Sequence, residues 1–221
     1  MTITPPVRDI SAIVFDGDVI NSRSQPSTLD WLDELCAEWN EALAADIAAD
    51  FKRTKGDEVQ GLLRPVADPL AVWLRYALAP DALPMRWALV AGPVFEHAGP
   101  ATDGDGPAYI RASSLLEQMR HSGELLRLET GVAALDDRLA LFSPWLGDWA
   151  ASLTAKQRAI LRIHLLASPA PSSRAQIAQI TQVDPSAVTR TLNSPTNRRM
   201  LGLLDILRAD IRTAQDGLLI S

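Results

Sequence analysis

The feature that most constrains this chain is a change of pattern part-way along it. Up to residue 129, short apolar runs typical of strands alternate with segments that have the 3–4 spacing of amphipathic helices. From about Leu135 onward only the helical spacing remains. We therefore predict an α+β domain over residues 1–132 and an all-α domain over residues 133–221.

The predicted order of elements in the first domain is strand, helix, strand, strand, helix, strand, helix, strand. The strands are expected at residues 10–15, 48–55, 58–64, 86–95 and 124–129. The helices are expected to begin at Ser27 or Thr28, after Asp68 and near Pro107. This order predicts a ferredoxin-like or palm-type fold, with a mostly antiparallel sheet and its helices on one face.

Charge is divided unevenly along the chain. The net charge is −6, but residues 1–153 hold 23 acidic and 12 basic residues, whereas residues 154–221 hold 4 acidic and 9 basic residues. A basic C-terminal part on an acidic body is typical of a sensor domain joined to a domain that binds a polyanion. Chance bias in two ordinary halves is the alternative explanation.

Residues 173–193 have the pattern of a helix-turn-helix. Ser172 or Ser173 can cap a short helix that begins at Arg174, and Asp184 followed by Pro185 can cap a second one after a turn at residues 181–183. The spacing places Ile177, Ala178, Ile180, Val183, Val188 and Leu192 inward. It places Ser186, Ala187, Thr189, Arg190 and Asn193 outward on the second helix.

Small polar side chains and one arginine on an outward helix face favour DNA binding, because they can reach base edges in the major groove. Ser186, Thr189, Arg190 and Asn193 are the candidate base contacts, and Arg174, Gln176, Arg198 and Arg199 are the candidate phosphate contacts. Capped short helices also occur in bundles that bind no nucleic acid, which is the alternative.

Acidic residues mark a candidate metal site in the first domain. Asp18 follows the first strand and Asp57 lies in the Gly56-Asp57 turn of the predicted hairpin, so a palm-type sheet would bring them together. Carboxylate oxygens suit Mg²⁺, and Asp16 and Glu58 are further candidates. The alternative is structural, because Gly-Asp is common in turns. Arg23, which can bind a phosphate or pair with Asp18, and Lys55 are the candidate nucleotide-binding residues.

Three segments resemble the SatD family of bacteria, over most of the chain and including the helical tail. They are Gly17-Asp-Val-Ile-Asn-Ser-Arg, Lys55-Gly-Asp-Glu and Asp105-Gly-Pro-Ala. The hairpin is also similar to the Lys-Thr-x-Gly-Asp of class III nucleotidyl cyclases and to the GGDEF signature of cyclic-dinucleotide synthases. The resemblance implies a cyclase-like palm domain with metal ligands at Asp18 and at Asp57 or Glu58.

One segment departs from the cyclase pattern. Class III cyclases carry an Asn and an Arg that stabilise the transferring phosphate, and the similar stretch at residues 103–114 has Ile110 and Ser114 in their places, with Arg111 one turn away. Loss of such groups lowers a rate by orders of magnitude. Cyclase activity is therefore not expected from this segment.

The sequence favours a cytoplasmic bacterial transcriptional regulator. It would bind double-stranded DNA as a homodimer and sense a nucleotide or another phosphate ligand through its first domain. The single cysteine, Cys36, the lack of an apolar run of ~20 residues and the lack of a signal pattern fit this expectation. The alternatives are a Mg²⁺-dependent nucleotidyl cyclase or transferase that uses the tail for targeting, and a scaffold that binds neither ligand.

Overall fold

The computed structural model describes residues 9–21, 28–54, 56–95 and 99–219. The chain divides into two compact units. Of the described residues, the first contains those from Asp9 to Ala67 and from Leu83 to Pro144, and the second contains Asp68–Ala82 and those from Trp145 to Leu219. The segment 68–82, which the sequence prediction assigns to the first domain, therefore belongs with the C-terminal helices.

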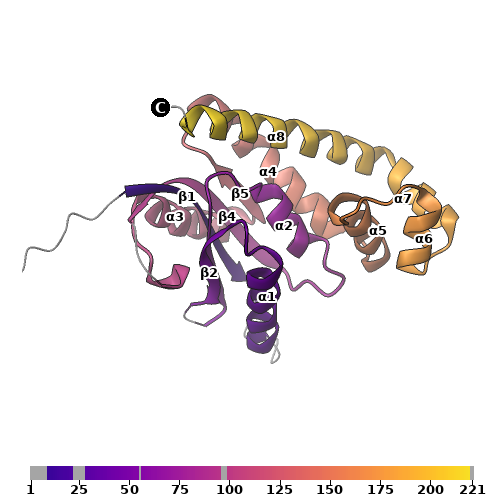
Figure 1. Ribbon diagram of the computed structural model, residues 1–221, viewed down its shortest axis with the longest axis horizontal. Coiled ribbons are helices and arrows are strands. Elements are labelled where there is room, and N and C mark those ends of the chain that lie inside the picture. Colours follow the sequence, from indigo (N-terminus) through magenta and orange to yellow (C-terminus); the bar gives the residue numbers. More distant parts are fainter. Residues whose placement is uncertain (1–8, 22–27, 55, 96–98, 220–221) are drawn as a thin grey trace, which may run out of the picture. The chain divides into compact units, whose positions relative to one another are not determined.

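The first unit is built on a five-stranded sheet in the order β2-β3-β1-β4-β5 (Figure 1). The strands are β1 (Asp9–Val19), β2 (Ile47–Arg53), β3 (Glu58–Leu63), β4 (Met85–Phe95) and β5 (Leu126–Glu129). All neighbouring pairs are antiparallel except β4 and β5, which are parallel. The predicted α+β class, the element order and the mostly antiparallel sheet are confirmed.

Helices α1 (Thr28–Ala42) and α3 (Pro107–Ser122) lie on opposite faces of this sheet. Successive residues of a strand point to opposite faces, and β1 contacts both helices. The Phe15 ring lies 6.3 Å from the Trp39 ring of α1, whereas the neighbouring Asp16 accepts a hydrogen bond from Ser113 of α3. The prediction that the helices share one face is wrong, because each face of β1 has its own covering helix.

Glycine at position 17 makes room for an aromatic cluster on the α1 face. Gly17 is paired with Trp87 across β1 and β4, and a Cβ atom at Gly17 would lie 2.6 Å from the Trp87 ring. That ring packs against Trp39, at 5.4 Å between ring centroids. The flanking Asp16 and Asp18 point to the other face. The alternation of side chains along β1 therefore directs Phe15 and Gly17 to the aromatic core and the two acids to the α3 face.

The loop before α3 is held against β4. Gly106 has a φ of +131°, and a Cβ atom there would lie 2.8 Å from the Cα of Val94. The N–H of Phe95 donates a hydrogen bond of 2.9 Å to the Asp105 carbonyl. Pro107 then takes the first helical position, which suits its fixed φ. The Asp105-Gly-Pro-Ala segment thus has a structural role in starting α3.

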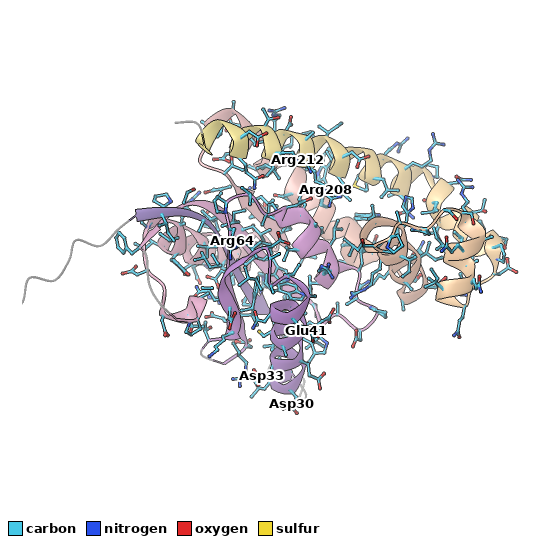
Figure 2. The ribbon with its side chains drawn as sticks, viewed as in Figure 1. Asp30, Asp33, Glu41, Arg64, Arg208 and Arg212 are labelled. Carbon is cyan, nitrogen blue, oxygen red and sulfur yellow. The ribbon has the colours of Figure 1, made fainter. Side chains whose placement is uncertain are left out.

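The second unit is helical. Its helices are α2 (Pro69–Ala77), the end of α4 (Ala133–Ser152), α5 (Ala155–Leu166), α6 (Arg174–Thr181), α7 (Pro185–Asn193) and α8 (Pro195–Leu219). Arg208 of α8, labelled in Figure 2, donates to Asp68, the N-cap of α2, over 2.6 Å. None of the helices in the described part of the chain has the length and hydrophobicity needed to span a lipid bilayer.

Candidate functional site

The acids of the first domain lie inside a strand rather than after it. Strand β1 continues to Val19, because Asp16 pairs with Gln60 of β3 and Asp18 pairs with Glu58 of β3 and Arg86 of β4. The expectation that Asp18 follows the first strand is therefore wrong. Asp16 and Asp18 are only 4% and 5% exposed, on the face that α3 covers.

Arg120 of α3 joins three carboxylates. Its Nε donates to the Asp18 carboxylate over 3.1 Å, and its two terminal nitrogens donate to Glu58 and Glu117, each over 2.9 Å. Arg86 lies 3.5 Å from the same Asp18 oxygen. We call Asp16, Asp18, Glu58, Arg86 and Arg120 the acid cluster. It contains three carboxyl groups and two guanidinium groups.

Burial and charge set the protonation of this cluster. Burial, with the negative charges of Glu58 and Asp18, raises the pKa of Asp16 to about 7. Burial also raises the pKa of Asp18, although the hydrogen bond and charge of Arg120 oppose that rise. Burial alone would lower the pKa of Arg120, but its carboxylate partners outweigh this and raise it. The guanidinium therefore stays charged, and Asp16 titrates near neutral pH.

The structure gathers some of the predicted metal and nucleotide residues. Asp16, Asp18 and Glu58 lie in the acid cluster, whereas Asp57 is half-buried in the turn, where its carbonyl accepts from the N–H of Val19 over 3.2 Å. Arg23 and Lys55 lie outside the described residues. No group of three or more His, Cys, Asp or Glu residues in the described ranges is placed to hold a metal ion, so Mg²⁺ stays a prediction.

Sequence reasoning missed both arginines of the cluster. One face of α3 carries residues at the 3–4 spacing of a helix, namely Ser113, Leu116 and Arg120. This spacing was the available signal that Arg120 faces the sheet. By contrast, Ile110 and Ser114, which take the places of the cyclase Asn and Arg, are exposed, and Arg111 pairs with Glu129. The side chains of α3 that reach the acids are therefore different from those that the cyclase pattern would supply.

A second candidate site lies on α6 and α7, which form at the predicted positions. Ser173 caps α6, Gln182 ends it in a left-handed conformation with a φ of 53°, and Asp184 caps α7. Ser186, Thr189, Arg190 and Asn193 are exposed on α7. Two details of the inward and outward assignment are wrong, since Ile180 is 51% exposed and Ala187 is 7% exposed.

Basic side chains surround this pair of helices. Arg174, at the start of α6, donates a hydrogen bond of 2.9 Å to Asn193, and Arg198 and Arg199 are exposed in the first turn of α8. A cavity of about 420 Å³ is lined by residues that include His164, Arg174 and Arg198. None of the described residues that line it is acidic. Gln176 is exposed, and its side-chain oxygen accepts from the Ser172 N–H over 2.8 Å.

Part of this chain resembles known structures. No family model and no curated protein matches the chain. Two structures of a bacterial light-regulated adenylyl cyclase resemble part of it, with TM-scores of 0.37 and 0.38 and sequence identities of 15% and 16%. Each likeness covers 57% of this chain and 45% of the other, so the chain spans less than half the length of those proteins. The resemblance to the SatD family stays a prediction.

Proposed function

We propose that this protein binds double-stranded DNA through α7. The observation that carries the proposal is the exposed face of this helix, where Ser186, Thr189, Arg190 and Asn193 follow the i, i+3, i+4, i+7 spacing. Such a face is small enough to enter a major groove that is roughly 12 Å wide. Arg190 is the side chain of this set that can donate two hydrogen bonds to a guanine.

The surroundings of α7 support the proposal. Exposed Arg174, Arg198 and Arg199 can neutralise phosphates on either side of the groove. Asn197 is 3% exposed and donates a hydrogen bond of 2.7 Å to the Thr191 carbonyl, which ties the end of α7 to the start of α8. A face held by a buried contact keeps its side chains in register with the bases.

The proposed regulator is a homodimer that senses a nucleotide or another phosphate compound through its first domain. Dimers of helix-turn-helix proteins bind two half-sites about 34 Å apart, so a palindromic target is expected. Membership of the SatD family, a cytoplasmic location and the helix-turn-helix character of residues 173–193 belong to the same proposal.

Binding of the purified protein to fragmented genomic DNA at two salt concentrations tests this function. We expect selective retention that weakens as salt rises. Arg190→Ala should then lose roughly 1–3 kcal/mol on the selected fragments. Arg198→Ala should weaken binding to all sequences alike, and Arg212→Ala, an exposed residue further along α8 (Figure 2), is the control. No retention at low salt would overturn the proposal.

A second candidate function is metal-dependent nucleotidyl transfer or cyclisation in the acid cluster. The observation that favours it is the placement of Asp16, Asp18 and Glu58 together on β1 and β3. Asp18 and Glu58 would hold a Mg²⁺ ion, and the ion would polarise a bound triphosphate. Incubation with Mg²⁺ or Mn²⁺ and nucleoside triphosphates tests the idea. Product formation that Asp18→Asn abolishes supports it, and no product from the wild type removes it.

A further inference from the structure

Arg120 holds the position between two carboxylates that come from different strands. Its Nε binds Asp18 of β1 and one terminal nitrogen binds Glu58 of β3, at 3.1 and 2.9 Å. We propose that Arg120 is the resident cation of the acid cluster, and that Mg²⁺ or Mn²⁺ binds Asp18 and Glu58 only after the guanidinium has left. This inference deepens the second candidate function and rests on it only for the choice of ligands.

The charges of Asp18 and Glu58 are balanced while Arg120 is in place. Two carboxylates, Asp18 and Glu58, face two guanidinium groups, Arg86 and Arg120. A divalent cation entering this arrangement would meet no net negative charge and would be repelled by both arginines. Removal of Arg120 leaves one excess negative charge beside oxygen ligands, which is the environment that a hard cation prefers.

Asp18 also keeps one oxygen for a ligand. Its Oδ2 takes the contacts with both arginines, whereas its Oδ1 is buried and has no hydrogen-bond partner among the described residues. A buried carboxylate oxygen without a partner costs free energy, and a coordinated cation would satisfy it. The protein thus carries a ligand atom that Arg120 leaves unused.

Arg120 can leave without disturbing the core. Its side chain is 38% exposed, while the neighbouring Met119 and Leu116 are buried and hold α3 against the sheet. Glu117, one turn before it and 59% exposed, already binds its third nitrogen. A rotation of the Arg120 side chain toward Glu117 and solvent would therefore open the site while α3 stays in place.

Mn²⁺ binding to the full chain, measured by titration calorimetry without nucleotide, tests this inference. The variants are Arg120→Met and, as a matched control on the same helix, Arg111→Met, which removes the exposed ion pair with Glu129. Arg120→Met should bind Mn²⁺ at least about tenfold more tightly than the wild type. Arg111→Met should behave as the wild type, and Asp18→Asn added to Arg120→Met should abolish the gain.

Three results would overturn the proposal. They are equal Mn²⁺ affinity in the wild type and Arg120→Met, a gain that Arg111→Met shares, and a gain that survives Asp18→Asn. If circular dichroism shows that Arg120→Met does not fold, Arg120→Gln decides, because its neutral amide removes the positive charge and keeps a polar side chain at the partly exposed position. Arg120→Gln should bind Mn²⁺ more tightly than the wild type, and unchanged binding would overturn the proposal. An absence of catalysis would not affect these readouts.

Discussion

The hydroxyl of Ser113 on α3 donates a hydrogen bond of 3.3 Å to the Asp16 carboxyl on β1. This contact joins the helix to a side chain that is 4% exposed. Burial, together with the charges of Glu58 and Asp18, raises the pKa of Asp16 from 3.8 to about 7. The folded protein therefore holds a proton that the unfolded chain has already released at mildly acidic pH.

Asp16 should make stability fall as the pH rises. Between about pH 4 and 7 the folded state binds a proton that the unfolded state has lost, so its contribution is complete below pH 4 and lost above pH 7. Each pH unit in this window is worth about 1.4 kcal/mol. Urea denaturation at pH 5 and pH 8 should show the wild type losing about 2–3 kcal/mol more than Asp16→Asn. An identical loss in both proteins would contradict the raised pKa.

Local signals predicted the order of the elements. The caps at Asp68, Ser173 and Asp184 form as their sequence patterns indicate, because capping involves residues within one turn. The extension of β1 beyond Phe15 was missed, since the polar Asp16-Gly17-Asp18 interrupts the apolar run and becomes a strand only through pairing with β3 and β4.

Contacts between distant residues were the part that the sequence could not supply. Arg120 and Asp18 lie 102 positions apart, and nothing near either residue indicates the other. Asp57 was preferred as a metal ligand because Gly56-Asp57 is a recognisable turn pattern, whereas the register places Glu58 opposite Asp18. A shift of one residue reverses the face to which a strand side chain points, so hairpin acids cannot be assigned without the register.

Gly17→Ala should destabilise the first unit. The added Cβ would lie 2.6 Å from the ring of Trp87, which is fully buried among other aromatic rings. Overpacking of this kind costs about 1–3 kcal/mol. Gly202→Ala in α8 is the control, since no atom lies within 4 Å of the added Cβ, and it should stabilise by up to about 1 kcal/mol. Chemical denaturation compares the two, and equal effects would disprove the clash.

Asp68 should contribute to the stability of the second unit in two separable ways, as a helix cap and as an ion-pair partner. Its Oδ1 accepts from the N–H of Ala71 as the N-cap of α2, and its Oδ2 accepts from Arg208. Asp68→Asn keeps the cap and weakens the ion pair, whereas Asp68→Ala loses both. Loss of an N-cap costs about 1 kcal/mol. Asp68→Ala should therefore have a lower melting temperature than Asp68→Asn. Arg208→Ala should match Asp68→Asn more closely than Asp68→Ala, and the opposite order would show that the ion pair dominates.

A comparison of Asn197→Ala with Asn193→Ala should distinguish residues that stabilise α7 from residues that bind DNA. The buried Asn197 accepts from the indole N–H of Trp149 over 2.9 Å and donates to the Thr191 carbonyl. The variant leaves the Trp149 N–H without this acceptor, and the Thr191 carbonyl keeps the N–H of Ser194 at 3.4 Å. A buried donor that loses its partner costs about 1–3 kcal/mol. Asn193→Ala, on the exposed face of α7, should leave thermal stability within about 0.5 kcal/mol and weaken binding to the selected DNA. If both variants lowered stability equally, the exposed face of α7 would have a structural role instead of a role in DNA recognition.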